Sequence, residues 1–148
     1  MPHLRGSLNS PGNRGPIIDF YVGVSKPHAD ALAAQKLPVP PMVQISGLID
    51  TGASCTCIDP QALSSLGLTA TGSAPIQTPS TQGTPHICNQ YDVSIRFPLP
   101  GMSYTIYAIP IIESELASQG IQALIGRDVL AKSVLVYDGV LGTFSIGF

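Results

Sequence analysis

One carboxylate, Asp50, ends an apolar run in this chain and is followed only by small residues. Residues 48–54 read Leu-Ile-Asp-Thr-Gly-Ala-Ser. A buried or half-buried aspartate is costly unless it is paired or hydrogen-bonded. The hydroxyls of Thr51 and Ser54 can satisfy neighbouring groups, and Gly52 permits a positive φ or a close approach by another segment. Asp50 is therefore a candidate for chemistry. The alternative is an ordinary strand-to-turn transition with an Asx turn.

Residues 48–53 match at every position the apolar-apolar-Asp-Thr/Ser-Gly-Ala motif of the aspartic proteases, and the chain resembles the retropepsin-like branch of that family. A second family feature is an apolar-apolar-Gly turn that opens a short helix near the C-terminus. Residues 123–130, Ala-Leu-Ile-Gly-Arg-Asp-Val-Leu, are similar to it. The two motifs occur in the family's order, with room for a flap hairpin between them. The resemblance covers residues 16–148 and implies a small closed β-barrel that acts as a dimer.

The resemblance also implies roles around Asp50. Thr51 would hydrogen-bond across to the other subunit and hold two aspartates coplanar, and the backbone of Gly52 would approach them closely. Ala53 completes the first motif. Gly126 and the arginine after it would support the active-site loop from the second motif.

Arg127 needs a carboxylate partner if it braces this loop. Several retroviral members carry an aspartate directly after Asp-Thr-Gly-Ala that pairs with this arginine, but Ser54 occupies that position here. Asp59 is the candidate replacement. A solvated charge at the start of a short helix is the alternative for Arg127, and such exposed charges contribute little.

A mobile hairpin that closes over the substrate is a further expectation from the resemblance. Residues 79–85 are rich in Gly and small polar residues, which suit a lid that excludes water on closing. A plain surface loop is the alternative. The flap candidates are Ser80, Thr81, Gln82, Gly83 and Thr84.

Peptide hydrolysis without a metal or a covalent nucleophile needs one group that activates water and another that protonates the substrate. Two carboxylates ~3 Å apart can share one proton and divide these tasks. The chain holds one Asp-Thr-Gly, because Asp138-Gly139 lacks the intervening hydroxyl residue. We therefore expect a homodimer with Asp50 from each subunit across a two-fold axis. In relatives the terminal strands build part of the dimer sheet, and residues 144–148 alternate suitably for that; an edge strand on the monomer is the alternative.

Composition bounds the class of protein. The chain of 148 residues is long enough for one domain with a real core. Charged residues make up only 11% and apolar residues 44%, so part of the surface is expected to be covered by a partner subunit. A net charge of −2 without basic clusters gives no case for nucleic acid or anionic membrane as a partner.

The chain shows no secretory signal and no apolar run of the ~20 residues that span a bilayer, which predicts a cytoplasmic protein. Its cysteines, Cys55, Cys57 and Cys88, are odd in number and expected to be reduced thiols. No second Cys/His pair stands at ligand spacing, so no metal site and no cofactor are predicted; a small apolar role is favoured for these thiols.

The remaining sequence predicts many short strands and few helices. The pair Asp138-Gly139 indicates a two-residue hairpin turn, and Asp59, Pro60 and Gly67 are typical of the N-cap, first position and end of a short helix. Residues 1–15, rich in Gly, Ser, Pro and Asn, are predicted as a flexible tail without fixed structure. The fold class is mostly β, a small closed barrel or sandwich. Strands are predicted over 16–24, 42–49, 87–97, 102–112, 134–137 and 140–148, and helical turns over 29–35, 59–67, 113–119 and 126–133.

The leading hypothesis is an aspartic endopeptidase that cleaves extended polypeptide. The main alternative is a non-catalytic binding or dimerisation module with the same fold, since fold does not imply function. A glycosidase with paired carboxylates is a weak third hypothesis, because Glu113 and Glu115 lie together on a predicted surface turn.

Overall fold

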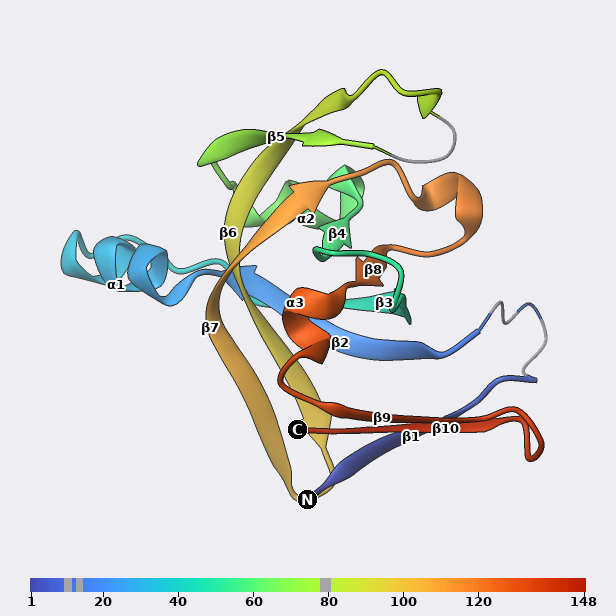
Figure 1. The fold of residues 1–148 in the computed structure, drawn as a ribbon. Coiled ribbons are helices and arrows are strands. Elements are labelled where there is room, and N and C mark those ends of the chain that lie inside the picture. Colours follow the sequence, from blue (N-terminus) through green and yellow to red (C-terminus); the bar gives the residue numbers. More distant parts are fainter. Residues whose placement is uncertain (10–11, 13–14, 78–80) are drawn as a thin grey trace.

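The computed structural model describes residues 1–9, 12, 15–77 and 81–148, and this part of the chain is mostly β (Figure 1). The predicted fold class is confirmed. The strands are β1 (His3–Ser7), β2 (Ile17–Val24), β3 (Val43–Ile49), β4 (Cys57–Ile58), β5 (Gly72–Ile76), β6 (His86–Leu99), β7 (Met102–Glu113), β8 (Ala123–Ile125), β9 (Val134–Asp138) and β10 (Thr143–Gly147). The α-helices are α1 (Lys26–Ala34), α2 (Pro60–Leu63) and α3 (Arg127–Leu130), and the 3-10 turns are η1 (Ser64–Leu66) and η3 (Ala117–Gln119).

Six strands close into a barrel in the order β2-β3-β8-β4-β7-β6, because β2 also pairs with β6. Strand β5 adds to the outer edge of β6 as an antiparallel hairpin partner. Two of the pairings, β3 with β8 and β4 with β7, are parallel. The parallel pairing of β3 with β8 brings the ends of these two strands together, and the two motifs found in the sequence follow at that point.

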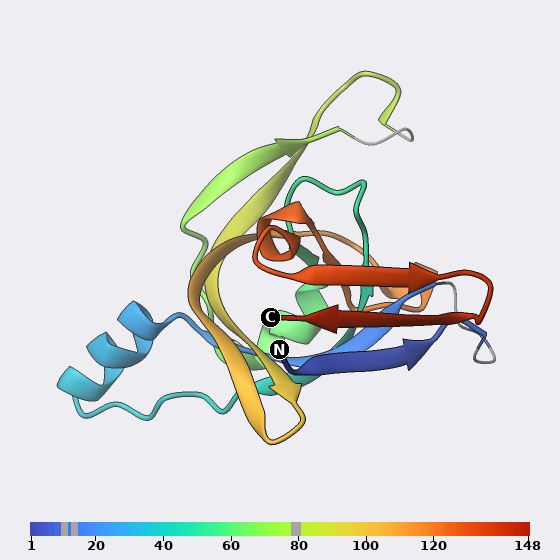
Figure 2. The ribbon, with the colours of Figure 1, turned by 60° about the horizontal axis from the view of Figure 1, so that its bottom comes forward.

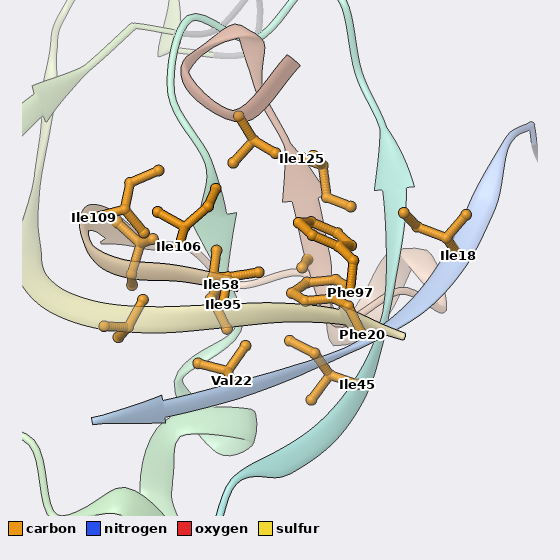
Figure 3. Packing of buried hydrophobic residues seen from close by; sticks show 14 of the residues in the cluster. Ile18, Phe20, Val22, Ile45, Ile58, Ile95, Phe97, Ile106, Ile109 and Ile125 are labelled. Carbon is orange, nitrogen blue, oxygen red and sulfur yellow. The ribbon is translucent and has the colours of Figure 1, made fainter. Parts of the chain in front are cut away.

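Alternating apolar residues of these strands fill the barrel (Figure 3). The rings of Phe20 and Phe97 lie 5.5 Å apart between centroids. Phe148, the last residue, stacks on Phe97 at 4.5 Å and on Tyr104 at 4.7 Å, so the C-terminus is anchored to the core. Fully buried members of the core include Val22, Ile45, Ile58, Val93, Ile95, Ile111 and Ile125.

A second sheet of three strands lies beside the barrel in the order β1-β10-β9 (Figure 2). Strand β1 pairs antiparallel with β10, with Leu4 opposite Ile146. The prediction of an unstructured stretch is therefore wrong for residues 3–7. The composition of this segment is typical of a tail, but pairing with β10 satisfies its backbone groups, and Leu4 and Leu8 pack against the core.

The hairpin from β9 to β10 has a longer turn than predicted. Asp138 pairs with Thr143, so four residues form the loop instead of the predicted Asp138-Gly139 pair. The Asp138 carboxylate accepts hydrogen bonds from the backbone N–H groups of Val140 and Leu141, at 3.0 and 2.9 Å, and Gly142 adopts a left-handed φ of 64°. This side-chain cap stabilises the longer loop.

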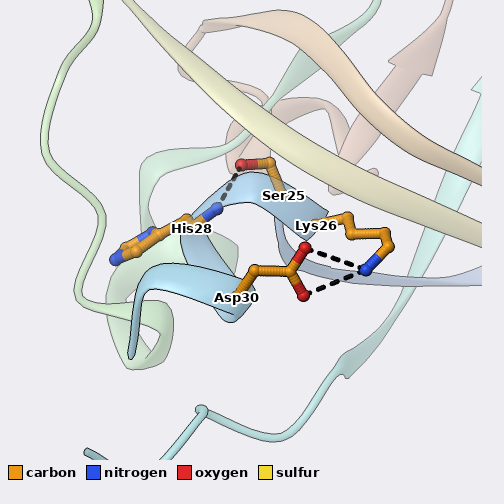
Figure 4. Close-up of polar contacts among 4 residues, drawn as sticks. All are labelled: Ser25, Lys26, His28 and Asp30. Carbon is orange, nitrogen blue, oxygen red and sulfur yellow. Dashed lines mark hydrogen bonds and ion pairs between the residues drawn. The ribbon is translucent and has the colours of Figure 1, made fainter. Parts of the chain in front are cut away.

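Helix α1 projects from the barrel and buries none of its residues. The Ser25 hydroxyl accepts a hydrogen bond from the His28 N–H, and Lys26 pairs with Asp30 (Figure 4). The helix begins three residues before the predicted turn at Ala29, because Ser25 provides its N-cap. The exposed ion pair adds little stability.

The helical signal over residues 59–67 is confirmed. Asp59 caps α2 by accepting from the Gln61 N–H at 2.9 Å, and Gly67 ends η1 with a φ of 59°. No helix in the described part of the chain is long and apolar enough to cross a membrane.

Candidate active site

Asp50 directly follows β3, on the face opposite to the barrel core. Burial alternates along this strand, with Ile45, Gly47 and Ile49 buried and Leu48 and Asp50 half-buried. The Asp50 N–H donates to the carbonyl of Ile125 at 3.0 Å, which continues the pairing of β3 with β8 by one residue. The apolar run therefore fixes the backbone at Asp50 while its side chain stays accessible.

A tight turn holds the Asp50 carboxylate. Its Oδ1 accepts a hydrogen bond from the Gly52 N–H at 2.8 Å, and the Ala53 N–H donates to the Asp50 carbonyl at 3.2 Å. A Cβ on Gly52 would lie 3.1 Å from the same Oδ1, so a side chain at position 52 would crowd the carboxylate. Thr51 is exposed beside it.

Arg127 supports this loop through backbone carbonyls instead of a carboxylate. Its Nη1 donates to the carbonyls of Thr51, at 3.1 Å, and Gly52, at 3.4 Å. Its backbone N–H donates to the carbonyl of Ala53 at 3.0 Å. The predicted bracing role is thus consistent with the contacts, but the proposed partner, Asp59, is wrong.

Asp59 instead joins α2 to the segment before η3. Its side chain is 2% exposed and accepts from the N–H groups of Leu116 and Ala117, both at 2.9 Å, besides that of Gln61. Burial alone would raise the pKa of Asp59, but the three N–H donors outweigh it and hold that pKa below its ordinary value. These donors engage both carboxylate oxygens, and within the described residues no hydrogen bond or ion pair joins Asp59 to Arg127.

Two residues that the sequence did not single out complete the loop support. Buried Thr56 donates through Oγ1 to Asp128 at 2.7 Å, and its N–H donates to the other carboxylate oxygen at 2.9 Å. The Gly126 N–H donates to Thr56 Oγ1 at 3.1 Å. The available signal for Asp128 is its place in the first turn of a predicted helix, next to Arg127.

Gly126 must be glycine for a steric reason. A Cβ at this position would lie 2.5 Å from both the carbonyl carbon and the oxygen of Cys55. Its φ of −88° is ordinary, so the requirement comes from backbone-to-backbone contact between α3 and the active-site loop. The structure therefore brings together Asp50, the turn after it, Gly126 and Arg127.

A family model described as aspartyl protease matches residues 43–129, more than half of the chain. The chain belongs to the aspartyl protease family. No curated protein matches it. Among solved structures, a retropepsin-like aspartic protease from Rickettsia conorii is similar, with a TM-score of 0.55 and 14% identity over 97% of this chain and 89% of that one. At this identity the likeness shows the retropepsin-like fold.

Two further structures are less similar. The retroviral protease-like domain of Ddi1 from Leishmania major has a TM-score of 0.41 and 13% identity, covering 85% of this chain and 84% of that one. The foamy viral protease-reverse transcriptase has a TM-score of 0.43 and 19% identity, covering 79% of this chain. This chain spans only 12% of that viral chain.

The flap candidates lie between β5 and β6, and the described part of this loop projects from the barrel (Figure 1). Thr81, Gln82, Gly83 and Thr84 belong to the described part, and Ser80 lies outside it. The Thr84 N–H donates to the carbonyl of Thr81 at 2.9 Å, and Gln82 and Gly83 adopt left-handed φ values of 47° and 84°. In the described residues, no hydrogen bond joins this loop to Asp50.

An apolar wall extends from Asp50 towards this hairpin. Leu48 and Leu124, which are paired in β3 and β8, pack against a small apolar cluster beside the main core. Ile76 and Cys88 of the β5–β6 hairpin, both half-buried, pack against the same cluster. Cys57 lies buried in that cluster, and burial followed by the neighbouring Cys55 raises its pKa to about 12. Because only the thiolate is reactive, Cys57 acts as a small apolar residue.

Proposed function

We propose that the protein is an aspartic endopeptidase that works as a homodimer, with Asp50 of each subunit in one catalytic pair. The observation that supports this most directly is the hydrogen-bonded turn at Asp50 in a chain of the aspartyl protease family. Two carboxylates in contact cannot both be ionised, so one of them keeps a proton. The ionised carboxylate activates a water, and the protonated one gives its proton to the substrate.

The second carboxylate is expected from a second copy, because the chain holds a single Asp-Thr-Gly and most of its other aspartates are engaged elsewhere. Asp59 and Asp128 accept backbone hydrogen bonds, and Asp138 caps the β9–β10 loop. Asp30 pairs with Lys26. The Asp19 carboxylate accepts from the Ser46 hydroxyl. A two-fold axis beside Asp50 provides the partner without any further residue.

The β9–β10 hairpin offers a surface for that second copy. Strand β9 is an edge strand, and it lacks the proline or lysine that commonly protects an edge. Val134 and Val136 are 52% and 54% exposed, and at the loop Val140 is 96% and Leu141 72% exposed. The hairpin points to the same side as the end of β3 in Figure 1. The residues first expected to form the dimer sheet lie in β10, whose two edges are occupied by β1 and β9.

The substrate would be a polypeptide in an extended conformation. Such a chain can lie against the apolar wall of Leu48 and Leu124 below the β5–β6 hairpin, with main-chain hydrogen bonds fixing its position. The flap loop, with its left-handed Gln82 and Gly83, would close over it.

The test is cleavage of an unfolded protein between pH 4 and 7 by the wild-type chain and by Asp50→Asn. We expect the variant to lose at least 99% of the activity while sedimenting as the same dimer, and a statine-type transition-state mimic to inhibit the wild type. Asp30→Asn, which removes an exposed carboxylate on α1, is the matched control and should retain activity. A wild type that dimerises but cleaves nothing would favour the non-catalytic module.

A further inference from the structure

The two glutamates of the chain, Glu113 and Glu115, line one cavity of about 360 Å³ between the β5–β6 hairpin and the end of β7. The other lining residues include Ile76 and Cys88 of the hairpin, His86 at the start of β6, and Ser114. The cavity therefore combines apolar side chains of the hairpin with two carboxylates, and Thr81 and Gln119 complete its described lining.

The Glu113 carboxylate is held in place by neighbours that carry no charge. Its Oε2 accepts from the Tyr91 hydroxyl at 2.8 Å and from the Asn89 amide at 3.5 Å. The nearby carboxylate, together with burial, raises the pKa of Tyr91, so the phenol remains a donor. In the described part of the chain, neither glutamate forms an ion pair; Lys26 and Asp30 form the ion pair found there. Among the described residues that line the cavity there is no lysine or arginine.

The position of the cavity connects it to Asp50. Ile76 and Cys88 line it and also pack in the cluster that contains Leu48 and Leu124, the apolar wall beside Asp50. A polypeptide lying along that wall would bring its side chains to the mouth of the cavity. A side chain that fills it needs an apolar stem against Ile76 and Cys88 and a positive end at the carboxylates.

We propose that this cavity is a substrate subsite for a lysine or arginine side chain, with Glu113 and Glu115 as the residues that determine the specificity. The inference rests on the proposed endopeptidase function and adds to it a substrate class, polypeptides with a basic residue near the cleaved bond. Glu113 receives the cation at a fixed position because Tyr91 orients its carboxylate. Glu115, which is exposed at the rim, attracts the same cation without a fixed partner.

The experiment compares peptides that differ at one position between lysine and norleucine, which share the stem but not the charge. A peptide library first identifies the position at which lysine matters, and kcat/KM is then measured at pH 6.5 to 7 for the matched pair. We expect the wild type to prefer lysine by roughly tenfold or more, since hydrogen bonds to charged groups contribute about 1.5–3 kcal/mol. The double variant E113Q/E115Q should reduce this ratio to near one. Asp92→Asn removes an exposed carboxylate of β6 that lies outside the cavity. This control should leave the ratio unchanged.

A separate variant tests whether Tyr91 positions the Glu113 carboxylate. Tyr91→Phe removes the hydroxyl that donates to Glu113 and retains the ring. The lysine preference should fall by a smaller factor than in E113Q/E115Q, through KM rather than kcat. A preference unchanged in both variants would overturn the assignment of the subsite.

A binding measurement separates the subsite from the catalytic proposal. The Asp50→Asn protein is titrated with the same two peptides, and binding is followed by calorimetry. Tighter binding of the lysine peptide that disappears on adding E113Q/E115Q supports the subsite, even if the wild type cleaves neither peptide. Equal binding of both peptides overturns the subsite, even if the wild type cleaves both.

Discussion

At the scale of single residues, the surroundings of the Asp50 loop depend on Gly126 and Asp59. Gly126 permits a close backbone contact because it has no side chain, and Asp59 is a buried carboxylate that accepts hydrogen bonds. Gly126 touches the Cys55 carbonyl where a Cβ would have no room. Asp59 accepts hydrogen bonds from three backbone N–H groups, including that of the buried Leu116. Neither residue touches the substrate in the proposed reaction. Their substitution should therefore be detected first in folding.

Gly126→Ala is expected to destabilise the protein by about 1–3 kcal/mol, because the added methyl group overlaps backbone atoms that cannot move independently. Gly72→Ala is the matched control, because its Cβ would find the nearest atom only at 4.0 Å and its φ is not left-handed. Urea denaturation of both variants measures the difference. Equal stability of the two would show that α3 and the loop can separate at little cost.

Asp59→Asn is expected to lower the free energy of unfolding at pH 7 by roughly 2–3 kcal/mol, the range for hydrogen bonds to a charged group. The folded state lowers the pKa of Asp59, so its contribution is complete above the unfolded value of about 3.9 and is lost as the pH falls through the folded value. The difference between wild type and variant should therefore shrink towards pH 2.

Chemical denaturation across this pH range measures that difference, with the exposed Asp92→Asn as the control. A difference that stays constant down to pH 2 would contradict the role of the Asp59 charge.

At the scale of elements, helix α3 is tied to the active-site loop by residues about seventy positions apart. Thr56 donates two hydrogen bonds to Asp128, and Arg127 donates to two carbonyls of the turn after Asp50. Because Arg127 and Asp128 of α3 both form hydrogen bonds with the loop, α3 holds the turn as well as β3 does. Loss of these contacts between α3 and the loop should change the position of Asp50 without disrupting the barrel.

Thr56→Val retains the shape of the side chain but removes the hydroxyl that donates to Asp128 and accepts from Gly126. We expect a loss of about 1–3 kcal/mol, because a buried donor and acceptor lose their partner, together with lower kcat on peptide. Thr143→Val, at an exposed position of β10, is the control. Thermal unfolding and initial rates distinguish the two, and identical kcat in both variants would contradict this coupling.

At the scale of the whole molecule, the apolar edge of β9 and the single Asp-Thr-Gly both support the proposed homodimer. The barrel is closed by β2 and β6 and has its own core, so the chain can fold alone. The three-stranded sheet keeps the open edge of β9, with Val134 and Val136 exposed. Antiparallel pairing of this edge with its copy would extend the sheet across a two-fold axis.

Val136→Lys is expected to raise the dissociation constant of the dimer by about tenfold or more, because it places a charge on the apolar edge. Val39→Lys provides a matched control, since Val39 is 45% exposed in the segment after α1, away from β9. Sedimentation velocity over a dilution series measures both, and activity should fall with the dimer. If Val136→Lys dimerises as well as Val39→Lys, β9 is not the interface.

The amino-acid sequence by itself determined the features that depend on neighbouring residues. The motif at Asp50, the capped helix after Asp59 and most strands follow from periodicity and short-range signals. The expectation of a second copy follows from the single Asp-Thr-Gly. Only the tertiary structure decided which groups meet over long separations: the acceptors of Arg127, the pair of Thr56 with Asp128, the place of β1, and the cavity of the two glutamates. The composition of residues 1–15 predicted a tail because it gives no information on β10, the distant strand with which β1 pairs. The physical reason is that hydrogen-bond partners and burial depend on which distant segments the fold brings together. The local sequence does not encode those contacts.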